Sequence, residues 1–257
     1  MASNPPLISV VMPVFNKRNS VRRSVASVRQ QSEADWELLL IDDGSTDGAD
    51  ALLRDLASED NRITLLGWPD NRGAAAARNA GIQAAKGRYI AFLDADDAWL
   101  PEKLAIQREH MERIGAGFVF SGYRRLDPSG RPLGDVQVPT RITYRDLLKR
   151  NVVGCLTAVY DTEVHGKVEM PDVRRRQDYG LWLRLLRDGG EAHGIDQVLA
   201  EYTVGGSSLS SNKMVAAQAT WRILRDQEGL ALPQAAWCFA HYAGAAVGQR
   251  LAHRVKR

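Results

Sequence analysis

The chain has 257 residues, of which 44% are hydrophobic and 25% are charged, and its formal net charge is +3. This length allows one large or two small domains, and the small net charge does not favour nucleic acid as a partner. The two cysteines, Cys155 and Cys238, give neither a disulfide framework nor a metal-finger spacing. No apolar run reaches the roughly 18 residues of a membrane-spanning helix, and the N-terminus is unlike a signal peptide, so the sequence predicts a cytoplasmic protein.

The first hundred residues alternate apolar runs with amphipathic segments. The apolar runs predict strands at 7–14, 36–41, 62–66 and 90–93, and the segments between them predict helices at about 19–31, 49–59 and 73–85. Strands that alternate with helices of about 10 to 15 residues are typical of parallel sheets built from βαβ crossovers. The sequence therefore predicts an α/β fold whose first half is Rossmann-like and binds a nucleotide.

Past residue 100 the pattern is less regular. It predicts helices at 102–114, 144–150 and 177–187, strands at 118–120, 155–160 and 195–204, and an irregular strand or loop at 130–138. Residues 161–176, with the cluster Arg174 to Arg176, predict a mobile loop, and residues 205–208 a flexible one. Two helices at 212–228 and 233–255 end the chain, and the second has a basic end (Arg250, His253, Arg254, Lys256 and Arg257). That end either packs on the domain or lies on anionic lipid at the inner face of the membrane.

Three carboxylates, Asp94, Asp96 and Asp97, directly follow the apolar run at 90–93. Carboxylates this close repel one another unless a cation or a proton relieves them. Mg2+ and Mn2+ prefer oxygen ligands and often complete their shells with substrate phosphates, and ligands of open α/β sheets bind outside the carboxyl ends of the strands. The stretch therefore predicts a metal site for a phosphorylated substrate. The structural alternative is an acidic turn in which Asp97 caps the next helix.

A second acidic strand end lies at 42–47, and the first strand ends at 13–16. In a parallel sheet these ends and the acidic stretch should face one crevice. For Asp43, the structural alternative is that it simply caps the helix at 49–59.

Four segments occur in a recognisable order: 9–16 (SVVMPVFN), 41–47 (IDDGSTD), 71–81 (NRG through ARNAG) and 92–97 (FLDADD). As a set they resemble the family 2 glycosyltransferases of GT-A fold. Two weaker segments follow, at 177–184, which is similar to that family's Glu-Asp motif, and at 202–210, which is similar to its closing segment. The resemblance covers roughly residues 7 to 210.

The resemblance implies a UDP-sugar donor, Mn2+ or Mg2+, and transfer with inversion to a hydroxyl of a glycan or lipid-linked glycan, as in polysaccharide biosynthesis. Residues 1–100 would bind the nucleotide-sugar, 101–210 would form the acceptor-binding and catalytic half of the same domain, and 211–257 would be a C-terminal helical extension. The implied nucleotide contacts are Pro13, Phe15, Asn16, Asp43, Asn71, Gly73, Arg78, Asp94 and Asp96. Asp96 and Asp97 would hold the metal, and Asp178 would be the general base.

Some of these roles have structural alternatives. Asp178 is also a carboxylate favoured by the dipole of a helix N-terminus, and Phe15 either packs in the core or stacks on the base. The sequence departs from the family pattern at Gln177, Thr203 and Gly205, where the family often has Glu, Arg and His. Arg174 to Arg176 could supply the missing positive charge.

Two other functions stay open on the sequence alone. One is a non-catalytic UDP-sugar-binding or assembly protein of the same fold, for which Gln177 and Thr203 give some ground. The other is a metal-dependent nucleotidyltransferase, which is disfavoured because a Gly-rich triphosphate loop is absent.

Overall fold

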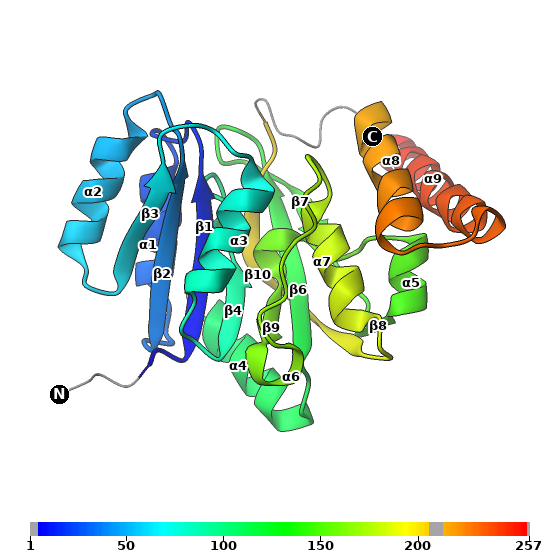
Figure 1. Cartoon of the computed structure of the whole chain (residues 1–257), viewed down its shortest axis with the longest axis horizontal. Coiled ribbons are helices and arrows are strands. Elements are labelled where there is room, and N and C mark those ends of the chain that lie inside the picture. Colours follow the sequence, from blue (N-terminus) through cyan, green and yellow to red (C-terminus); the bar gives the residue numbers. More distant parts are fainter. Residues whose placement is uncertain (1–4, 206–212, 256–257) are drawn as a thin grey trace.

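The computed structural model describes residues 5–205 and 213–255, with side chains described for 5–205 and 215–244. A mixed sheet crosses the molecule (Figure 1), and its main path runs β3-β2-β1-β4-β9-β6-β10-β5. The strands are β1 (Ile8–Val14), β2 (Trp36–Asp43), β3 (Ile63–Trp68), β4 (Tyr89–Phe92), β5 (Ala98–Trp99), β6 (Phe118–Leu126), β7 (Pro132–Val136), β8 (Arg141–Thr143), β9 (Val159–Asp161) and β10 (Glu191–Thr203).

The first four strands of this path are all parallel, as the alternation of strands and helices predicts. Val10 of β1 lies beside Leu38 of β2 and Ala91 of β4, so the centre of the sheet is apolar on both sides of β1. The carboxyl ends of β1, β2 and β4 consequently meet at one edge of the sheet, the upper edge in Figure 1. This arrangement confirms the Rossmann-like first half.

The second half of the sheet is mixed. β9 runs antiparallel to both β4 and β6, whereas β6 and β10 are parallel to each other. The carboxyl ends of β6 and β10 therefore lie at the same edge as those of β1, β2 and β4. The amino end of β9 lies there too, preceded by a 3-10 helix at Cys155–Thr157.

Several predicted boundaries are wrong in this half. The strand expected at 155–160 is a 3-10 turn followed by β9, because Thr157 donates from its N–H and its hydroxyl to the Gly154 carbonyl. The loop expected at 161–176 contains a short helix, α6 (Thr162–His165), which the Asp161 carboxylate caps. The strand at 118–120 extends to Leu126 because its polar second half pairs with β7 and β10. The sequence did not predict β5 or β8.

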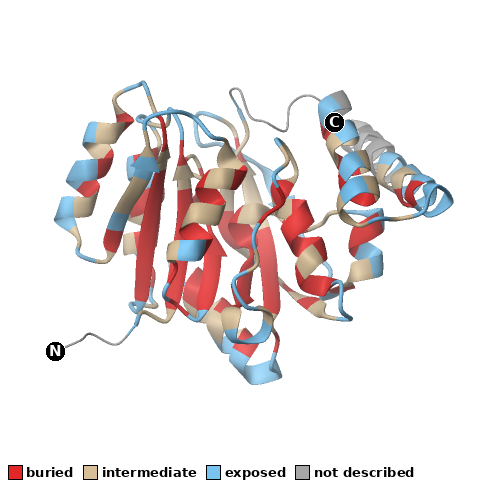
Figure 2. Cartoon of the chain, in the orientation of Figure 1, coloured by how far each residue is buried: buried red, intermediate tan, exposed pale blue. Residues whose placement is uncertain are grey.

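Helices cover both faces of the sheet, and each face has its own core. Val10 and Met12 pack on the side of α1 (Val21–Arg29), α2 (Ala49–Glu59) and α4 (Lys103–Ile114). Val11 packs on the opposite side with α3 (Ala74–Ala84) and α7 (Gln177–Leu186). Figure 2 shows the central strands as the most continuously buried part of the chain. Trp182 of α7 is fully buried and stacks on Phe118 with ring centroids 5.0 Å apart, so it is a core residue.

Two further helices follow the sheet and complete the predicted architecture. α8 (Lys213–Arg222) continues into a π-helical turn at Ile223–Gln227, and α9 (Leu232–Val255) follows. Ala235 and Cys238 of α9 are buried in the same core as Leu147 of α5 (Tyr144–Lys149). No helix in the described ranges is long and apolar enough to cross a membrane.

Candidate active site

The segments that carry the predicted site residues lie together at the carboxyl edge of the sheet. The chain leaves β1, β2 and β4 there, which places Phe15 and Asn16, Asp43, and the stretch 94–97 along one edge. α7 leads from this edge toward the start of β10 at the opposite edge, so its first turn, with Asp178, lies at the same edge. Segments that are far apart in the sequence thus meet where ligands of open α/β sheets bind.

Asp43 is buried and organises the segment before α3. One of its carboxylate oxygens accepts from the Trp68 indole N–H and the Arg72 backbone N–H, each at 2.7 Å. The other accepts from the Asn71 amide and the Gly73 backbone N–H, each at 2.9 Å. The α2 N-cap is Gly48, so the alternative in which Asp43 caps that helix is wrong. Asp43, Asn71 and Gly73 form one hydrogen-bonded unit that shapes the site.

Asn16 joins the end of β1 to the loop after β2. Its side-chain oxygen accepts from the Thr46 N–H at 2.8 Å, its own N–H donates to the Ser45 hydroxyl at 3.0 Å, and its φ of 53° is left-handed. Phe15 next to it is 43% exposed, so it does not pack in the core. Its ring is free to serve as a platform for a flat ligand.

Two of the three clustered acids are paired with cations. Asp94 forms an ion pair with the buried Arg78. Asp96 forms one with Lys17, with 2.5 Å between the Nζ and the carboxylate oxygen. The sequence analysis missed Lys17, although it directly follows the motif that ends at Asn16.

Asp97 is the most buried of these acids. Its carboxylate accepts from the Thr203 backbone N–H at 2.9 Å, a bond that ties the acidic stretch to the end of β10. Burial, followed by the charges of Asp94 and Asp96, raises the pKa of Asp97 well above its usual range. The structural alternative, in which Asp97 caps α4, is wrong, because that helix begins at Lys103 with Glu102 at its N-cap.

The acidic stretch has the chemistry of a hard-cation site but only part of a coordination shell. Among the described residues, no group of three or more His, Cys, Asp or Glu side chains is arranged to hold a metal ion. Asp96 and Asp97 offer carboxylate oxygens, and the crowding of negative charge at Asp97 is what a cation would relieve. These residues fit Mg2+ or Mn2+ provided that substrate phosphates and water complete the shell.

Asp178 lies in the first turn of α7, and the N-cap residue of this helix, Arg176, adopts a left-handed φ of 63°. Burial raises the pKa of its carboxyl, while Arg78, the Tyr179 N–H and Arg176 lower that pKa in part. A carboxylate with a raised pKa is a stronger base, in its ionised form, than an ordinary carboxylate.

Arg78 connects the acidic stretch to Asp178. Its guanidinium pairs with Asp94 and acts on the pKa of Asp178, while its Nε has no hydrogen-bond partner among the described residues. The next residue, Asn79, clamps the segment that leads to α7, because its amide donates to the Met170 carbonyl at 2.9 Å and accepts from the Met170 N–H at 2.8 Å. Arg78 is therefore a buried cation that pairs with Asp94 and lies near enough to Asp178 to affect its pKa.

Two other residues near the site are Cys155, which the sequence did not indicate, and Arg176, which belongs to the arginine cluster noted in the sequence. Cys155 lies close enough to Arg78 and Asp178 for each to affect the pKa of its thiol, which burial raises well above the usual range. No motif indicated this position. Of the arginine cluster, Arg176 donates to the Tyr242 hydroxyl at 2.7 Å and so binds α9. Residues 206–210 of the expected closing segment lie outside the described residues.

Comparisons with known proteins agree with this geometry. The family model described as glycosyl transferase family 2 matches residues 9–159. A Bacillus subtilis protein named as a teichuronic acid biosynthesis glycosyltransferase, TuaG, is 42% identical over 98% of this chain and 100% of its own length. The Escherichia coli protein named UDP-Glc:alpha-D-GlcNAc-diphosphoundecaprenol beta-1,3-glucosyltransferase WfgD is 37% identical over 86% of each chain.

Solved structures share the fold at low sequence identity. TarS residues 1–349 from S. aureus, in complex with UDP, superposes with a TM-score of 0.70 at 15% identity, over 92% of this chain and 70% of that one. The mannosyltransferase PcManGT from Pyrobaculum calidifontis, in complex with GDP-Man and Mn2+, gives 0.68 at 19% identity, over 97% of this chain and 76% of that one.

Proposed function

The chain belongs to glycosyl transferase family 2, and from this premise we propose that it moves a sugar from a UDP-sugar to a hydroxyl of a glycan or lipid-linked glycan. It is a glycosyltransferase of GT-A fold; its donor, acceptor and mechanism are the proposal. The observation that carries it is the position of Arg78, which pairs with Asp94 of the acidic stretch and acts electrostatically on Asp178. The proposed donor site at Asp94 and the proposed general base Asp178 are therefore both influenced by one buried cation, Arg78.

On the donor side, Phe15 is an exposed ring at the end of β1, suited to stack on uracil beside Pro13. Asp43 acts on the donor through the segment it holds, because its two oxygens already accept four hydrogen bonds from that segment and Trp68. Asn71 and Gly73 thereby present a fixed backbone to the nucleotide. Residues 1–100 are accordingly assigned to the donor, 101–210 to the acceptor and catalysis, and 211–257 to a helical extension.

Asp96 and Asp97 would hold Mn2+ or Mg2+ together with oxygens of the donor diphosphate. The chemistry supplied by such a cation is neutralisation of the charge that develops on the leaving diphosphate. For Asp96 to act as a ligand, its ion pair with Lys17 must open or be shared. Both side chains of this pair are partly exposed, so opening it costs about 1 kcal/mol or less.

On the acceptor side, Asp178 takes the proton of the attacking hydroxyl. The acceptor oxygen then forms a bond to the anomeric carbon while the bond from that carbon to the diphosphate oxygen breaks, and the electron pair leaves with UDP. One positioned carboxylate suffices for this single displacement, which inverts the anomeric carbon. Arg78 lowers the pKa of Asp178 and so favours its ionised form.

The relatives guide the choice of substrates. TuaG is named for the biosynthesis of a polysaccharide, and WfgD is named for transfer from UDP-Glc to a GlcNAc linked to a diphosphate lipid. We therefore place UDP-glucose and a lipid-linked GlcNAc first among donors and acceptors to be tested. The two alternatives, a non-catalytic binding protein and a nucleotidyltransferase, gain no support from these relatives.

The test is the variant Asp178→Asn, assayed for UDP release and product formation with UDP-glucose, UDP-galactose or UDP-N-acetylglucosamine. Removal of a general base should lower turnover about 10²-fold or more, with UDP affinity unchanged. Asp188→Asn, in the exposed turn that follows the same helix, is the matched control and should keep full activity. Full turnover in Asp178→Asn would remove Asp178 from its role, and pyrophosphate release from a nucleoside triphosphate would identify a nucleotidyltransferase.

A further inference from the structure

A groove with an apolar floor lies between α5 and the first half of α9, at the end of the molecule opposite α2 (Figure 1). Its volume is about 500 Å3, and Leu148, Leu230, Pro233 and Cys238 line it. Trp237 forms one wall and is 63% exposed. A largely exposed indole beside an apolar groove is typical of a surface that binds a partner or a membrane.

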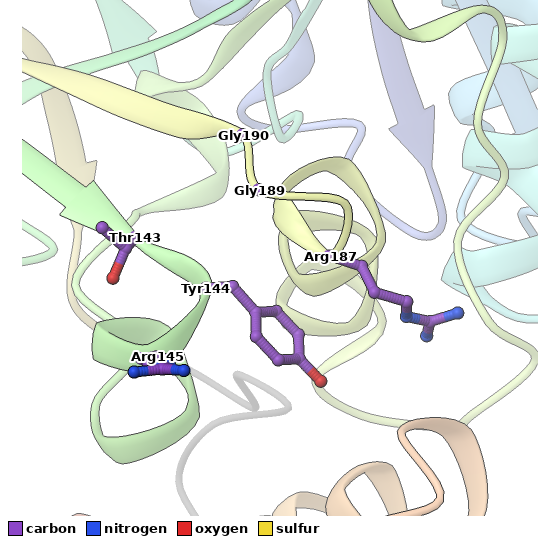
Figure 3. A pocket seen from close by; sticks show the side chains of 6 residues that line it. All are labelled: Thr143, Tyr144, Arg145, Arg187, Gly189 and Gly190. Atoms are coloured by element: carbon purple, nitrogen blue, oxygen red, sulfur yellow. The ribbon is translucent and has the colours of Figure 1, made fainter.

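The groove is held in place by its own hydrogen bonds. Tyr144 at the start of α5 donates to Glu228 at 2.6 Å, and Arg187 after α7 donates to the other oxygen of the same carboxylate at 2.9 Å. Both side chains are labelled in Figure 3, where they line a smaller hollow of about 290 Å3 beside the groove. The residue Glu228 directly follows the π-helical turn before α9. This network fixes α5 against the base of α9, so the groove is a built feature of the fold.

The rim of the groove is basic. Arg145 and Lys149 line it one helical turn apart on α5, and Arg150 is exposed next to them. The exposed acid on this helix, Asp146, is engaged with Thr143 in a capping box at the helix start. Farther along the chain, residues 231–257 contain four Lys or Arg residues and no Asp or Glu. The charged side chains that line the groove, Arg145 and Lys149, are therefore both basic.

We propose that this groove docks on an anionic phospholipid surface, with Trp237 and Leu232 entering the acyl boundary and Arg145 and Lys149 meeting lipid phosphates. Trp is favoured at membrane interfaces because its ring is apolar and its N–H is polar. Leu232 is 59% exposed at the start of α9 and extends the apolar surface beyond the groove. Reversible attachment to membranes usually needs an apolar and a basic signal together, and this end of the molecule offers both. The proposal is independent of which sugar the enzyme transfers.

Binding of the full-length protein to vesicles tests the proposal. We expect binding to vesicles of phosphatidylcholine with phosphatidylglycerol, little binding to phosphatidylcholine alone, and weakening by salt. Trp237→Ala should reduce the affinity about tenfold, and the double variant Arg145→Gln/Lys149→Gln about 25-fold, at about fivefold per charge. Arg54→Gln, which removes an exposed charge from α2 at the opposite end, should bind as the wild type does.

Three results would overturn the proposal. Equal binding to neutral and anionic vesicles would remove the role of charge. Wild-type binding by both groove variants would show that the basic C-terminal end acts without the groove. A dimer in sedimentation experiments that Trp237→Ala abolishes, with no vesicle binding by the wild type, would assign the groove to a second copy of the chain.

Discussion

Replacing Arg78 with Gln separates its electrostatic role from a merely structural one. Arg78 is buried and pairs with Asp94, whose side chain keeps 34% of its surface exposed. Breaking a fully buried ion pair by removing one partner costs about 3–5 kcal/mol, and the exposure of Asp94 reduces our expectation to about 2 kcal/mol. For a chain of this size, that loss lowers the melting temperature by about 4–8 °C.

The functional consequence should appear in the pH dependence of turnover. Arg78 lowers the pKa of Asp178, so loss of this nearby opposite charge raises that pKa. Asp178 accepts a proton only when ionised, so the pH below which kcat falls should move up by the same amount. The assay is kcat at saturating donor and acceptor between pH 4.5 and pH 9, and Arg78→Lys should restore part of the shift.

Arg88→Gln is the matched control for this experiment. Arg88 pairs at 2.7 Å with the buried Asp161, beside the amino end of β4 and therefore away from the site. Its loss should lower stability by a similar amount and leave the pH profile in place. An unmoved profile in a folded Arg78→Gln protein would refute the electrostatic link between Arg78 and Asp178.

Two further predictions use cations that the sequence analysis did not single out. If Lys17 and the metal compete for the Asp96 carboxylate, Lys17→Met should tighten Mn2+ binding in the presence of UDP by up to about fivefold, measured by titration. Weaker Mn2+ binding by this variant would contradict such competition. Lys103 is fully buried and bonded to Gln107, and burial lowers its pKa well below the usual value, so burying this amine costs increasing stability as the pH falls below the pKa of the unfolded chain. Lys103→Met should therefore gain stability at pH 7 relative to the wild type, and urea unfolding should show that gain vanish near pH 10.5; an equal gain at both pH values would contradict this account.

The first half of the fold was predictable because its signals are local. Each of its strands is a short apolar run, and each run ends in a segment with turn or acidic residues. The prediction of α2 at 49–59 agrees with the observed bounds Ala49–Glu59. Parallel strands then fix which ends meet, so the position of the site followed from the order of the elements.

The second half depends on contacts between distant segments. β5 has two residues and exists because it pairs with β10, a hundred residues away. The polar end of β6 is a strand only because β7 and β10 lie on either side of it. Local periodicity carries none of this information, which is why those boundaries were missed.

The site shows the same division. The sequence placed Asp43 and the acidic stretch at the right edge, since each follows a strand. The sequence did not indicate that the Asp43 carboxylate accepts its hydrogen bonds from Trp68 and the residues before α3. These bonds depend on how β3 lies beside β2. Nor did it indicate that Arg78 pairs with Asp94, which requires α3 to pack against the end of β4.

Calorimetric titration with UDP, UDP-glucose, UDP-galactose, UDP-N-acetylglucosamine and GDP-mannose, with and without Mn2+, tests the central claim most directly. We expect that a uridine nucleotide binds, that binding needs the metal, and that Asp97→Asn abolishes it while the protein stays folded. Asn keeps an oxygen that accepts from the Thr203 N–H, so this variant removes the charge without removing the bond. Absence of binding by every nucleotide in the presence of Mn2+ would contradict the assignment of the site.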